Sequence, residues 1–424
     1  MMRLGVRDIF KGIRLSTQEN IQEYDTGDGT GNSLSGGPSI SSEEIRKYVN
    51  IPVATVARIN EPWIAEELIA NGKCDMCMIG GPNLCDSEFS NKAFEGKVDD
   101  IRPCIGCGRC LTGIMFGKRI SCTVNPSVED NTITEADVKK NVLVIGGGPA
   151  GMEAAYVAKK RGHHVVLCEK SNELGGQLRI AAVPIAKQDL TLVIKYMAHK
   201  LEGVDVRLNT EVVEINRKEK YVLSSTGEKF YYDKLVLAQG GNPIIPKLNG
   251  IDRQNIFTVR TLKDADKIKE YISKNEVRTA VVIGAGFIGI EMAENLAHLG
   301  IETKVVELAD QILTSVDYEV ACFAQNEMRA NGVELFLSDG VKSFSETKIE
   351  LNSGFQIDYD MAILSIGIVP ETTLAKKSGL EVNRGIKVND RMQTNDENIY
   401  AGGDSVEIKS FVTNNDVLIP LAGP

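Results

Sequence analysis

One internal repeat constrains the fold of this chain more than any other feature of its sequence. NVLVIGGGPAGMEAAYVAKKRGHHVVLCEK begins at residue 141, and TAVVIGAGFIGIEMAENLAHLGIETKVVEL begins at residue 279. The two segments share three glycines and a glutamate at a constant offset of 138 residues, namely Gly146, Gly148, Gly151 and Glu169 in the first and Gly284, Gly286, Gly289 and Glu307 in the second. The chain is therefore predicted to hold two copies of one structural unit.

Each copy predicts a buried strand, a glycine turn, a helix and a second strand that ends in glutamate, which is the dinucleotide-binding βαβ unit. The first glycine makes the tight turn, the second lets the backbone approach the pyrophosphate, and the third lets helix and strand pack closely. The helix N-terminus offers free N–H groups to the phosphates, and the glutamate can accept hydrogen bonds from ribose hydroxyls. Two matches in the right context favour dinucleotide binding over glycine turns that serve packing alone.

The residues after the second glutamate indicate which nicotinamide cofactor is preferred. Glu307 is followed by Leu308, Ala309 and Asp310. No Arg or Lys stands there to meet a 2′-phosphate, so the second unit favours NADH over NADPH.

A cluster of four cysteines precedes the first unit, in the spacing C-x2-C-x2-C-x11-C at Cys104, Cys107, Cys110 and Cys122. Zinc usually takes two separated C-x2-C pairs, whereas three closely spaced cysteines with one more distant suit an iron–sulfur cube. The small residues Gly106 and Gly108 let the loop wrap around such a cluster. The spacing favours a 4Fe–4S cluster, with zinc or unliganded thiols as the alternatives.

Composition excludes other classes of function. The net charge is −10 and no basic stripe is present, so a nucleic-acid partner is not expected. The first residues contain no apolar signal region, and no apolar run approaches the roughly 20 residues of a membrane span. We interpret the chain as cytoplasmic and without a membrane partner, where thiols stay reduced and clustered cysteines indicate metal or redox chemistry.

From residue 141 onward the chain resembles the two-dinucleotide flavoprotein reductases, which nest an NAD domain inside an FAD domain. The family's FAD-contacting segments correspond to LGGQL at 174–178, LVLAQGGNP at 235–243 and IYAGGDS at 399–405. The resemblance implies that the first unit holds FAD with the help of Gly176, Gln177, Gly403 and Asp404, and that the second unit holds NADH. Gln239 replaces a threonine of the family, in a segment that works largely through its backbone.

Within these reductases, EMAENLAHLG and VEIKSFVTNNDVLIPLAGP are most similar to NADH oxidases and coenzyme A-disulfide reductases. Those enzymes use a redox cysteine after the first unit, and this chain has no cysteine between Cys168 and Cys322. Cys168 is predicted to lie in a buried strand and Cys322 in a helix, both as core thiols. Disulfide-reductase activity therefore does not carry over.

CIGCGRC, the distant Cys122 and the following VNP resemble the cluster segment of the 2,4-dienoyl-CoA reductase, trimethylamine dehydrogenase and enoate reductase family, which is old yellow enzyme-like. Its members order an FMN-bearing barrel, the cluster, the FAD domain and a nested NAD domain. The resemblance implies that electrons pass from NADH through FAD and the 4Fe–4S cluster to FMN, which reduces an activated C=C bond of an enoate or enoyl-thioester. The catalytic residue of that last step cannot be named, because the barrel strands that would bear it are absent.

The expected fold is α/β, with nested three-layer Rossmann-like FAD and NAD domains after a partial (β/α)8 barrel remnant and an iron–sulfur loop. The stretch 51–84 predicts strand, helix, strand, and resembles the last two βα units of the family's barrel, which needs roughly 250 residues. In this part Gly81 replaces a phosphate-binding arginine of the family. The expected divisions are 1–50 unplaced with a flexible loop at 26–39, 51–100 the barrel remnant, 101–130 the iron–sulfur segment, 131–255 the first part of the FAD domain, 256–349 the NAD domain and 350–424 the second part of the FAD domain.

Both ends are short against this family, so the sequence is interpreted as a fragment. The alternatives are an electron-transfer subunit that needs a barrel protein as partner, an NADH oxidase-like flavoprotein and an inactive remnant; a homo-oligomer is also compatible. FMN is expected only where a complete barrel is supplied.

The remaining cysteines and the histidines give no site on sequence grounds. Cys74 and Cys77 form a C-x2-C pair in a predicted strand, where residues three apart face opposite sides and do not share a metal. Cys85 is unpaired and uninformative. His163, His164, His199 and His298 show no metal or triad spacing, and surface or capping roles are expected.

Overall fold

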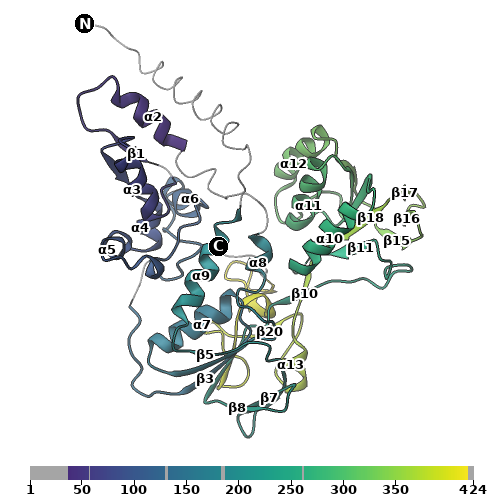
Figure 1. The fold of residues 1–424 in the computed structure, drawn as a ribbon. Coiled ribbons are helices and arrows are strands. Elements are labelled where there is room, and N and C mark those ends of the chain that lie inside the picture. Colours follow the sequence, from purple (N-terminus) through teal and green to yellow (C-terminus); the bar gives the residue numbers. More distant parts are fainter. Residues whose placement is uncertain (1–36, 57, 129–131, 183–186, 260–261, 419–424) are drawn as a thin grey trace. The chain divides into compact units, whose positions relative to one another are not determined.

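The computed structural model describes residues 37–56, 58–128, 132–182, 187–259 and 262–418 (Figure 1). These residues divide into two compact units: the first ends at Thr210 and the second begins at Glu211. This division does not coincide with the limits at 130 and 255 that the sequence predicts.

In the first unit, helix α2 (Gly37–Arg46) is followed by a small strand–helix–strand motif. Strands β1 (Ala54–Val56) and β2 (Met76–Met78) pair in parallel, and α3 (Pro62–Ala70) connects them. Apolar side chains of α3 form a small core with Ile59 and Cys74. The predicted strand–helix–strand order is confirmed. Of the loop expected at 26–39, residues up to 36 lie outside the described range, and the last three instead begin α2.

Short helices follow and carry the cysteine cluster. They are α4 (Gly81–Cys85), α5 (Phe89–Phe94), the 3-10 helix η1 (Val98–Asp100) and α6 (Arg109–Met115). Gly108 adopts a left-handed φ of 72° immediately before α6, a conformation that glycine reaches without strain. Cys104 and Cys107 therefore lie in a loop that turns directly into α6, and Cys110 lies in the first turn of that helix.

The first repeat forms the βαβ unit that its sequence predicts. Strands β3 (Asn141–Ile145), β4 (His164–Cys168) and β5 (Asp205–Arg207) run parallel in that order. Helix α7 (Pro149–Lys160) packs on β3 and β4 and against α9 (Leu190–Lys200), and the short α8 (Leu178–Ala181) precedes α9 (Figure 1). Cys168 ends β4 and is buried, as predicted.

The second repeat also forms the predicted βαβ unit, in β12 (Thr279–Ile283), α11 (Phe287–His298) and β13 (Glu302–Val306). Its five-stranded sheet is parallel throughout, in the order β11-β18-β12-β13-β14, with β11 (Ile256–Thr258), β14 (Glu334–Phe336) and β18 (Met361–Leu364). Helices α10 (Leu262–Lys274) and α12 (Tyr318–Ala330) complete it. Cys322 lies in α12 as predicted, but it is only partly buried and is not the core thiol expected.

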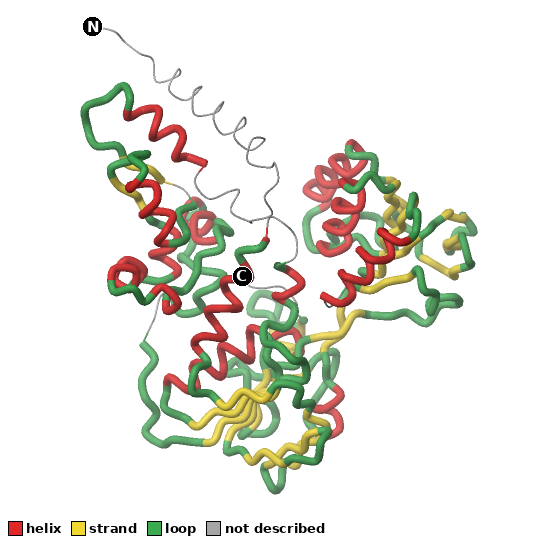
Figure 2. The backbone as a smooth tube through the Cα atoms, viewed as in Figure 1, coloured by secondary structure: helices red, strands yellow, loops and turns green. Residues whose placement is uncertain are grey.

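This part of the second unit is built in three layers (Figure 2). Ala280 and Val282 of β12 face a core shared with the helices. The alternate residues Val281 and Ile283 face a second core shared with an antiparallel sheet, β15 (Val341–Phe344), β16 (Lys348–Leu351) and β17 (Gln356–Asp358). Because side chains alternate along a strand, burial on both faces explains the uninterrupted apolar sequence of β12.

The limit predicted at 349 for the second nucleotide domain is corrected by β18. This strand comes from the range 350–424, yet it pairs with both β11 and β12 inside the parallel sheet. All four of its residues, MAIL, are buried. A short, fully apolar strand is typical of a parallel sheet that is buried on both faces. The β15–β17 sheet, which precedes β18 in the chain, packs against one face of this parallel sheet.

The rest of the second unit consists of short strands and one helix. They are β6 (Val212–Asn216), β7 (Tyr221–Ser224), β8 (Lys229–Tyr231), β9 (Lys234–Leu237), β10 (Gly241–Pro243), β19 (Ile368–Pro370), α13 (Thr373–Lys377), β20 (Ile386–Lys387), β21 (Ile399–Ala401), the 3-10 helix η3 (Gly403–Ser405), β22 (Val406–Lys409) and β23 (Asp416–Val417). Strands β9 and β21 pair in parallel, and β10 and β19 pair antiparallel. Among the helices described, none has both the length and the apolar character needed to cross a membrane.

Candidate functional site

The first glycine turn places its predicted residues around the N-terminus of α7. Gly146 has a φ of 109°, and its N–H donates to the carbonyl of Cys168 at 2.9 Å. Gly148 is the N-cap of α7, and a Cβ added there would contact nothing within 4 Å. Gly151 is buried in the first helical turn. The helix therefore begins beside an open space, with the free N–H groups of its first turn available to a phosphate.

Glu169 is held at the same turn. Its Oε2 accepts a hydrogen bond from the N–H of Gly147 at 2.6 Å, and its Oε1 accepts from the N–H of Ser171 at 2.8 Å. The carboxylate is thereby fixed at the end of β4, where acceptors for ribose hydroxyls lie in dinucleotide-binding units.

The LGGQL segment packs directly against this turn. The Gly175 N–H donates to the carbonyl of Gly147 at 2.8 Å. A Cβ on Gly176, whose φ is 51°, would lie 3.0 Å from the Cα of Gly148. Gln177 follows as the N-cap of α8. The structure thus brings the 174–178 segment to the first glycine turn, as a site shared by these residues requires.

The second glycine turn reproduces the geometry of the first. Gly284 has a φ of 97°, and Glu307 accepts a hydrogen bond from the N–H of Ala285 at 2.6 Å. A Cβ on Gly286 would contact nothing within 4 Å, whereas one on Gly289 would lie 1.9 Å from the carbonyl oxygen of Gly284. Gly286 is therefore free to face a ligand, and Gly289 is required for close packing of helix and turn.

Polar groups in the second unit lie at the two late segments that the flavoprotein resemblance marks. Gln239 follows β9, and its buried Oε1 has no hydrogen-bond partner among the residues that the structure describes. Gly403 and Asp404 form η3 after β21, and burial raises the pKa of the Asp404 carboxyl. An unpartnered buried acceptor is costly unless a ligand or water supplies a donor. These residues fit a polar cofactor.

The four predicted ligand cysteines lie in one segment of the first unit, between residues 104 and 122. Burial raises the pKa of Cys104, the backbone N–H of Gly106 opposes this effect, and the charges of Cys122, Cys107 and Cys110 raise the pKa further. All three thiols therefore lie close enough to Cys104 to interact with it electrostatically. Thr123 also contacts Cys107, with its Oγ1 at 3.2 Å from the sulfur.

Cys122 is surrounded by donors. A hydrogen bond from Cys85 lowers its pKa most, and the N–H groups of Asn125 and Val124 contribute, with a net value of about 6. The Asn125 N–H lies 3.4 Å from the sulfur. N–H groups aimed at thiolate sulfur stabilise it and tune iron–sulfur clusters. The donor set fits a thiolate-ligated cluster.

Cys85, which sequence reasoning set aside as uninformative, is part of this site. It ends α4, is 1% exposed, and lies beside Cys122 and Cys104. Its carbonyl accepts a hydrogen bond from Asn125 at 3.0 Å. Only the proline and glycine that start α4 hint locally at such a turn; the contact itself spans 37 residues of sequence to Cys122.

A single-ion geometry is not seen at these thiols. Among residues 37–56, 58–128, 132–182, 187–259 and 262–418, no three His, Cys, Asp or Glu side chains are placed to hold one metal ion together. The case for a cluster in this loop rests on the proximity of the thiols and on their N–H donors.

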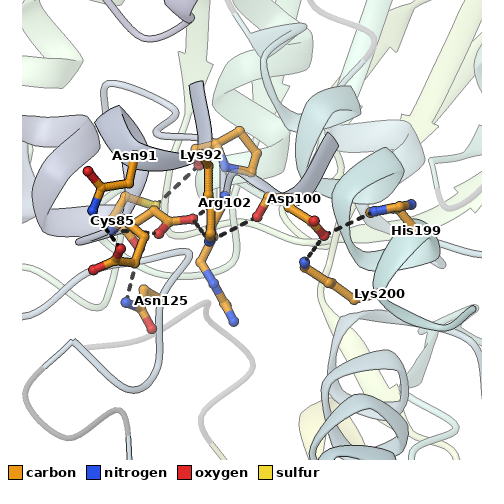
Figure 3. A network of polar contacts seen from close by, with 11 residues as sticks. Cys85, Asn91, Lys92, Asp100, Arg102, Asn125, His199 and Lys200 are labelled. Atoms are coloured by element: carbon orange, nitrogen blue, oxygen red, sulfur yellow. Dashed lines mark hydrogen bonds and ion pairs between the residues drawn. The ribbon is translucent and has the colours of Figure 1, made fainter. Parts of the chain in front are cut away.

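Arg102 joins the cysteine loop to the first nucleotide unit. Its guanidinium donates to the carbonyl of Val124 at 2.8 Å, lies 3.6 Å from Glu153 of α7 and stacks over Tyr196 of α9 at 5.2 Å. Figure 3 shows Arg102 near Cys85, Lys92 and Asn125. A second connection comes from Arg58, which pairs with Asp189 at 3.0 Å. The loop is therefore fixed relative to α7 and α9.

Asp86 anchors the same region and gives a pH-dependent prediction. Burial raises the pKa of Asp86, but its ion pair with Lys92 at 2.6 Å and the N–H of Arg102 outweigh burial and hold the pKa below its ordinary value. A lowered pKa stabilises the fold above the unfolded-state value of about 3.9, and the contribution is lost as pH falls through the folded-state value. Asp86→Asn should lower the free energy of unfolding by about 1–3 kcal/mol at pH 7.

Thermal unfolding of the wild-type chain and of Asp86→Asn at pH 7 and at pH 3 measures this effect. The difference between the two proteins should shrink at pH 3. Asp99→Asn, at an exposed carboxyl of η1, is the matched control and should leave stability unchanged. An Asp86→Asn penalty that stays constant with pH would contradict the electrostatic account.

A cavity of about 300 Å³ lies elsewhere in the first unit and does not contain the predicted site residues. It is lined by Asp100, Tyr156, Lys159, Lys160, His199, Lys200 and Glu202. Its charges are largely paired: Lys200 contacts Asp100, and His199 bridges Asp100 at 3.2 Å and Glu202 at 3.0 Å (Figure 3). His199 thus has the surface role expected for it.

Comparison with known proteins identifies the family. Residues 140–416 match the family described as Pyridine nucleotide-disulphide oxidoreductase. The chain belongs to this family. Membership accounts for both glycine turns and establishes the FAD- and NAD-binding Rossmann type of α/β oxidoreductase fold.

Two of the three similar proteins described next match more of the chain than that range. An NADH oxidase from Thermoanaerobacter brockii is 39% identical over 66% of this chain and 42% of its own length. A cinnamate reductase from Clostridium sporogenes is 32% identical over 78% of this chain and 49% of its own length. The solved 2-naphthoyl-CoA reductase is 26% identical with a TM-score of 0.69, over 89% of this chain and 54% of that chain. The chain spans about half the length of these proteins.

Proposed function

We propose that this chain is the NADH-dependent electron-transfer part of an iron–sulfur flavoenzyme related to the 2,4-dienoyl-CoA reductase, trimethylamine dehydrogenase and enoate reductase family. The observation that carries the proposal is that four cysteines lie in one short segment, 104–122, which Arg102 ties to α7 and α9 of the first dinucleotide unit. Membership of the oxidoreductase family supports the NAD(P)H- and flavin-dependent half of the proposal.

Each group of residues has a separate task. Gly146, Gly148 and Gly151 leave space and N–H groups for the FAD pyrophosphate, Glu169 orients its ribose, and Gly176 and Gln177 contact the rest of it. The resemblance to the flavoprotein reductases assigns Gly403 and Asp404 to FAD as well. Gly284, Gly286, Gly289 and Glu307 do the same for NADH. Cys104, Cys107, Cys110 and Cys122 hold a 4Fe–4S cluster. FAD and the cluster supply two-electron and one-electron redox chemistry, respectively, when they are bound.

The specificity for NADH follows from the end of β13. The Ala309 N–H donates to Glu307 at 2.9 Å and fixes the carboxylate that would face the ribose. A carboxylate repels a 2′-phosphate, and neither Leu308 nor Asp310 compensates with positive charge. We therefore assign NADH rather than NADPH to this site.

An enoate is the proposed class of final acceptor. A cinnamate is an α,β-unsaturated carboxylate, and the match to cinnamate reductase covers more of this chain than residues 140–416 do. The match to 2-naphthoyl-CoA reductase covers still more, so it includes much of the segment before residue 140. In this proposal β1, α3 and β2 are the last units of a barrel whose remaining strands, with FMN, complete the acceptor site.

Acceptor assays with the purified, cofactor-loaded chain test the proposal. NADH should reduce a one-electron viologen dye catalytically, while cinnamate alone is not consumed until a barrel protein is added. Cys107→Ser should lose more dye reduction than NADH-dependent flavin bleaching. Equal dye reduction in wild type and Cys107→Ser would contradict a role for the cysteine loop in electron transfer.

A second candidate function is an NADH oxidase reaction with oxygen as acceptor. The 39% identity to the Thermoanaerobacter brockii NADH oxidase favours it. Oxygen uptake that matches NADH consumption and is unaffected by Cys107→Ser would select this function over the first.

A further inference from the structure

We propose that Cys74 and Cys77 form a redox-active dithiol that small disulfides oxidise reversibly to an intramolecular disulfide. Their sulfur atoms lie 3.8 Å apart. This corrects the expectation that they face opposite sides: only Met76–Met78 form strand β2, and Cys74 lies before it in the turn after α3. A disulfide bond is about 2.05 Å long, so the sulfurs need to approach by less than about 2 Å, within reach of side-chain rotation.

The backbone between the two cysteines is held in the conformation that brings them together. The Asp75 N–H donates to the carbonyl of Val53 at 2.8 Å, and the Asp75 carboxylate accepts from the Val53 N–H at 2.7 Å. The same carboxylate pairs with Arg46 at 2.9 Å. Cys77 is fixed in turn by the pairing of β2 with β1, opposite Thr55. The approach of the two thiols is thus built into the fold of this motif.

Differences in burial set the order of the reaction. Cys77 is half-buried, whereas Cys74 is 2% exposed within the core beneath α3. The Cys77 thiolate attacks a small disulfide RSSR, forms a mixed disulfide and releases RS⁻. The Cys74 thiolate then attacks the Cys77 sulfur, closes the Cys74–Cys77 bond and releases the second RS⁻. The two thiols lose two electrons and two protons, which appear in two molecules of RSH.

The electrostatics make this a slow exchange site. Burial and the neighbouring Cys74 raise the pKa of Cys77 to about 11. The thiolate is the attacking species, so only a small fraction of the protein reacts at any moment near neutral pH. A pair of this kind suits a lasting response to redox conditions better than rapid catalytic turnover.

The segment that holds Cys74 and Cys77 leads directly to a contact with the cysteine loop. Strand β2 leads through Gly80 into α4, and a Cβ on Gly81 would lie 3.3 Å from the sulfur of Cys104. Gly81, only four positions after Cys77, therefore lies against Cys104 of the cysteine loop. The pair lies outside residues 140–416, so it is separate from the region that defines the family.

Equilibration of the full, cofactor-loaded chain with glutathione and glutathione disulfide under nitrogen tests the proposal. Free thiols are then alkylated, and tryptic peptides are analysed by mass spectrometry. The expected product is peptide 74–92 with Cys74 and Cys77 both protected as one disulfide and Cys85 alkylated; fragment ions distinguish these positions. Reduction with dithiothreitol should restore alkylation of both.

Two variants make the test decisive. Cys77→Ser should leave Cys74 alkylated at every glutathione ratio, and Cys74→Ser should trap a mixed disulfide between Cys77 and glutathione. Cys322→Ser, in the helix α12, is the control and should leave the Cys74–Cys77 product unchanged. Separate alkylation of Cys74 and Cys77 in the wild-type chain at all ratios, or a bridge between Cys74 and Cys85, would overturn the proposal.

Discussion

Replacing Cys107 with serine is expected to abolish iron binding while leaving FAD in place. The iron content should fall from about four atoms per chain to near zero, because a cubane cluster needs four thiolates. Cys107 is the exposed member of the four, so its replacement disturbs packing least. The residues around Gly148 that we propose to bind FAD lie on α7 and the turn before it, and Cys107 is not among them. Iron and flavin are measured on the same sample by metal analysis and by absorption after denaturation.

Cys322→Ser is the matched control for this prediction. The substitution is chemically identical, but Cys322 lies in α12 of the second unit, whereas the cysteine loop belongs to the first unit. Iron and flavin contents should both equal those of the wild type. An unchanged iron content in Cys107→Ser would remove Cys107 from the ligand set, and a parallel loss of flavin would indicate unfolding of the first unit.

The second large effect is expected for Gly286→Ala. The backbone at Gly286 has φ −74° and ψ −177°, which alanine adopts without strain, and the added Cβ meets no atom within 4 Å among the residues that the structure describes. Only a bound pyrophosphate would meet the methyl group. The KM for NADH should rise about tenfold or more, equivalent to a loss of about 1.4 kcal/mol of binding free energy. The melting temperature should stay unchanged.

Gly289→Ala separates this binding effect from a packing effect three residues away. Its Cβ would lie 1.9 Å from the Gly284 carbonyl oxygen and 2.6 Å from the Ser365 hydroxyl. Overpacking of this kind should destabilise the second unit by about 3 kcal/mol, seen as a lower melting temperature without NADH. Gly286→Ala with wild-type kinetics for NADH would show that the second turn does not bind the cofactor.

The local elements of the nucleotide units were predictable because their determinants are close in sequence. The apolar runs VLVI and AVVI fix β3 and β12, and the glycines that follow fix the turns into α7 and α11. Glu169 and Glu307 reach the same turns because each ends the next strand of its βαβ unit. The repeat alone therefore located both dinucleotide units.

Contacts over long sequence separations were not predictable in the same way. The apolar sequence of β18 does not indicate that the strand inserts between β11 and β12. A buried strand in either of the two five-stranded sheets would have the same apolar pattern. Cys85 reaches Cys122 only through the packing of α4 on the loop. Cys74 and Cys77 are a local exception: the sequence predicts both in one strand, whereas β2 begins only at Met76, and element boundaries are the least accurate part of such a prediction.

An anaerobic absorption spectrum of the purified chain, recorded before and after addition of NADH, tests whether electrons pass from NADH through FAD to the cysteine loop. We predict flavin bands over a broad iron–sulfur shoulder, with both bleached by NADH. Bleaching in the flavin bands alone would contradict electron transfer to the cysteine loop. A colourless chain, or bands that NADH leaves unchanged, would contradict the proposed function as a whole.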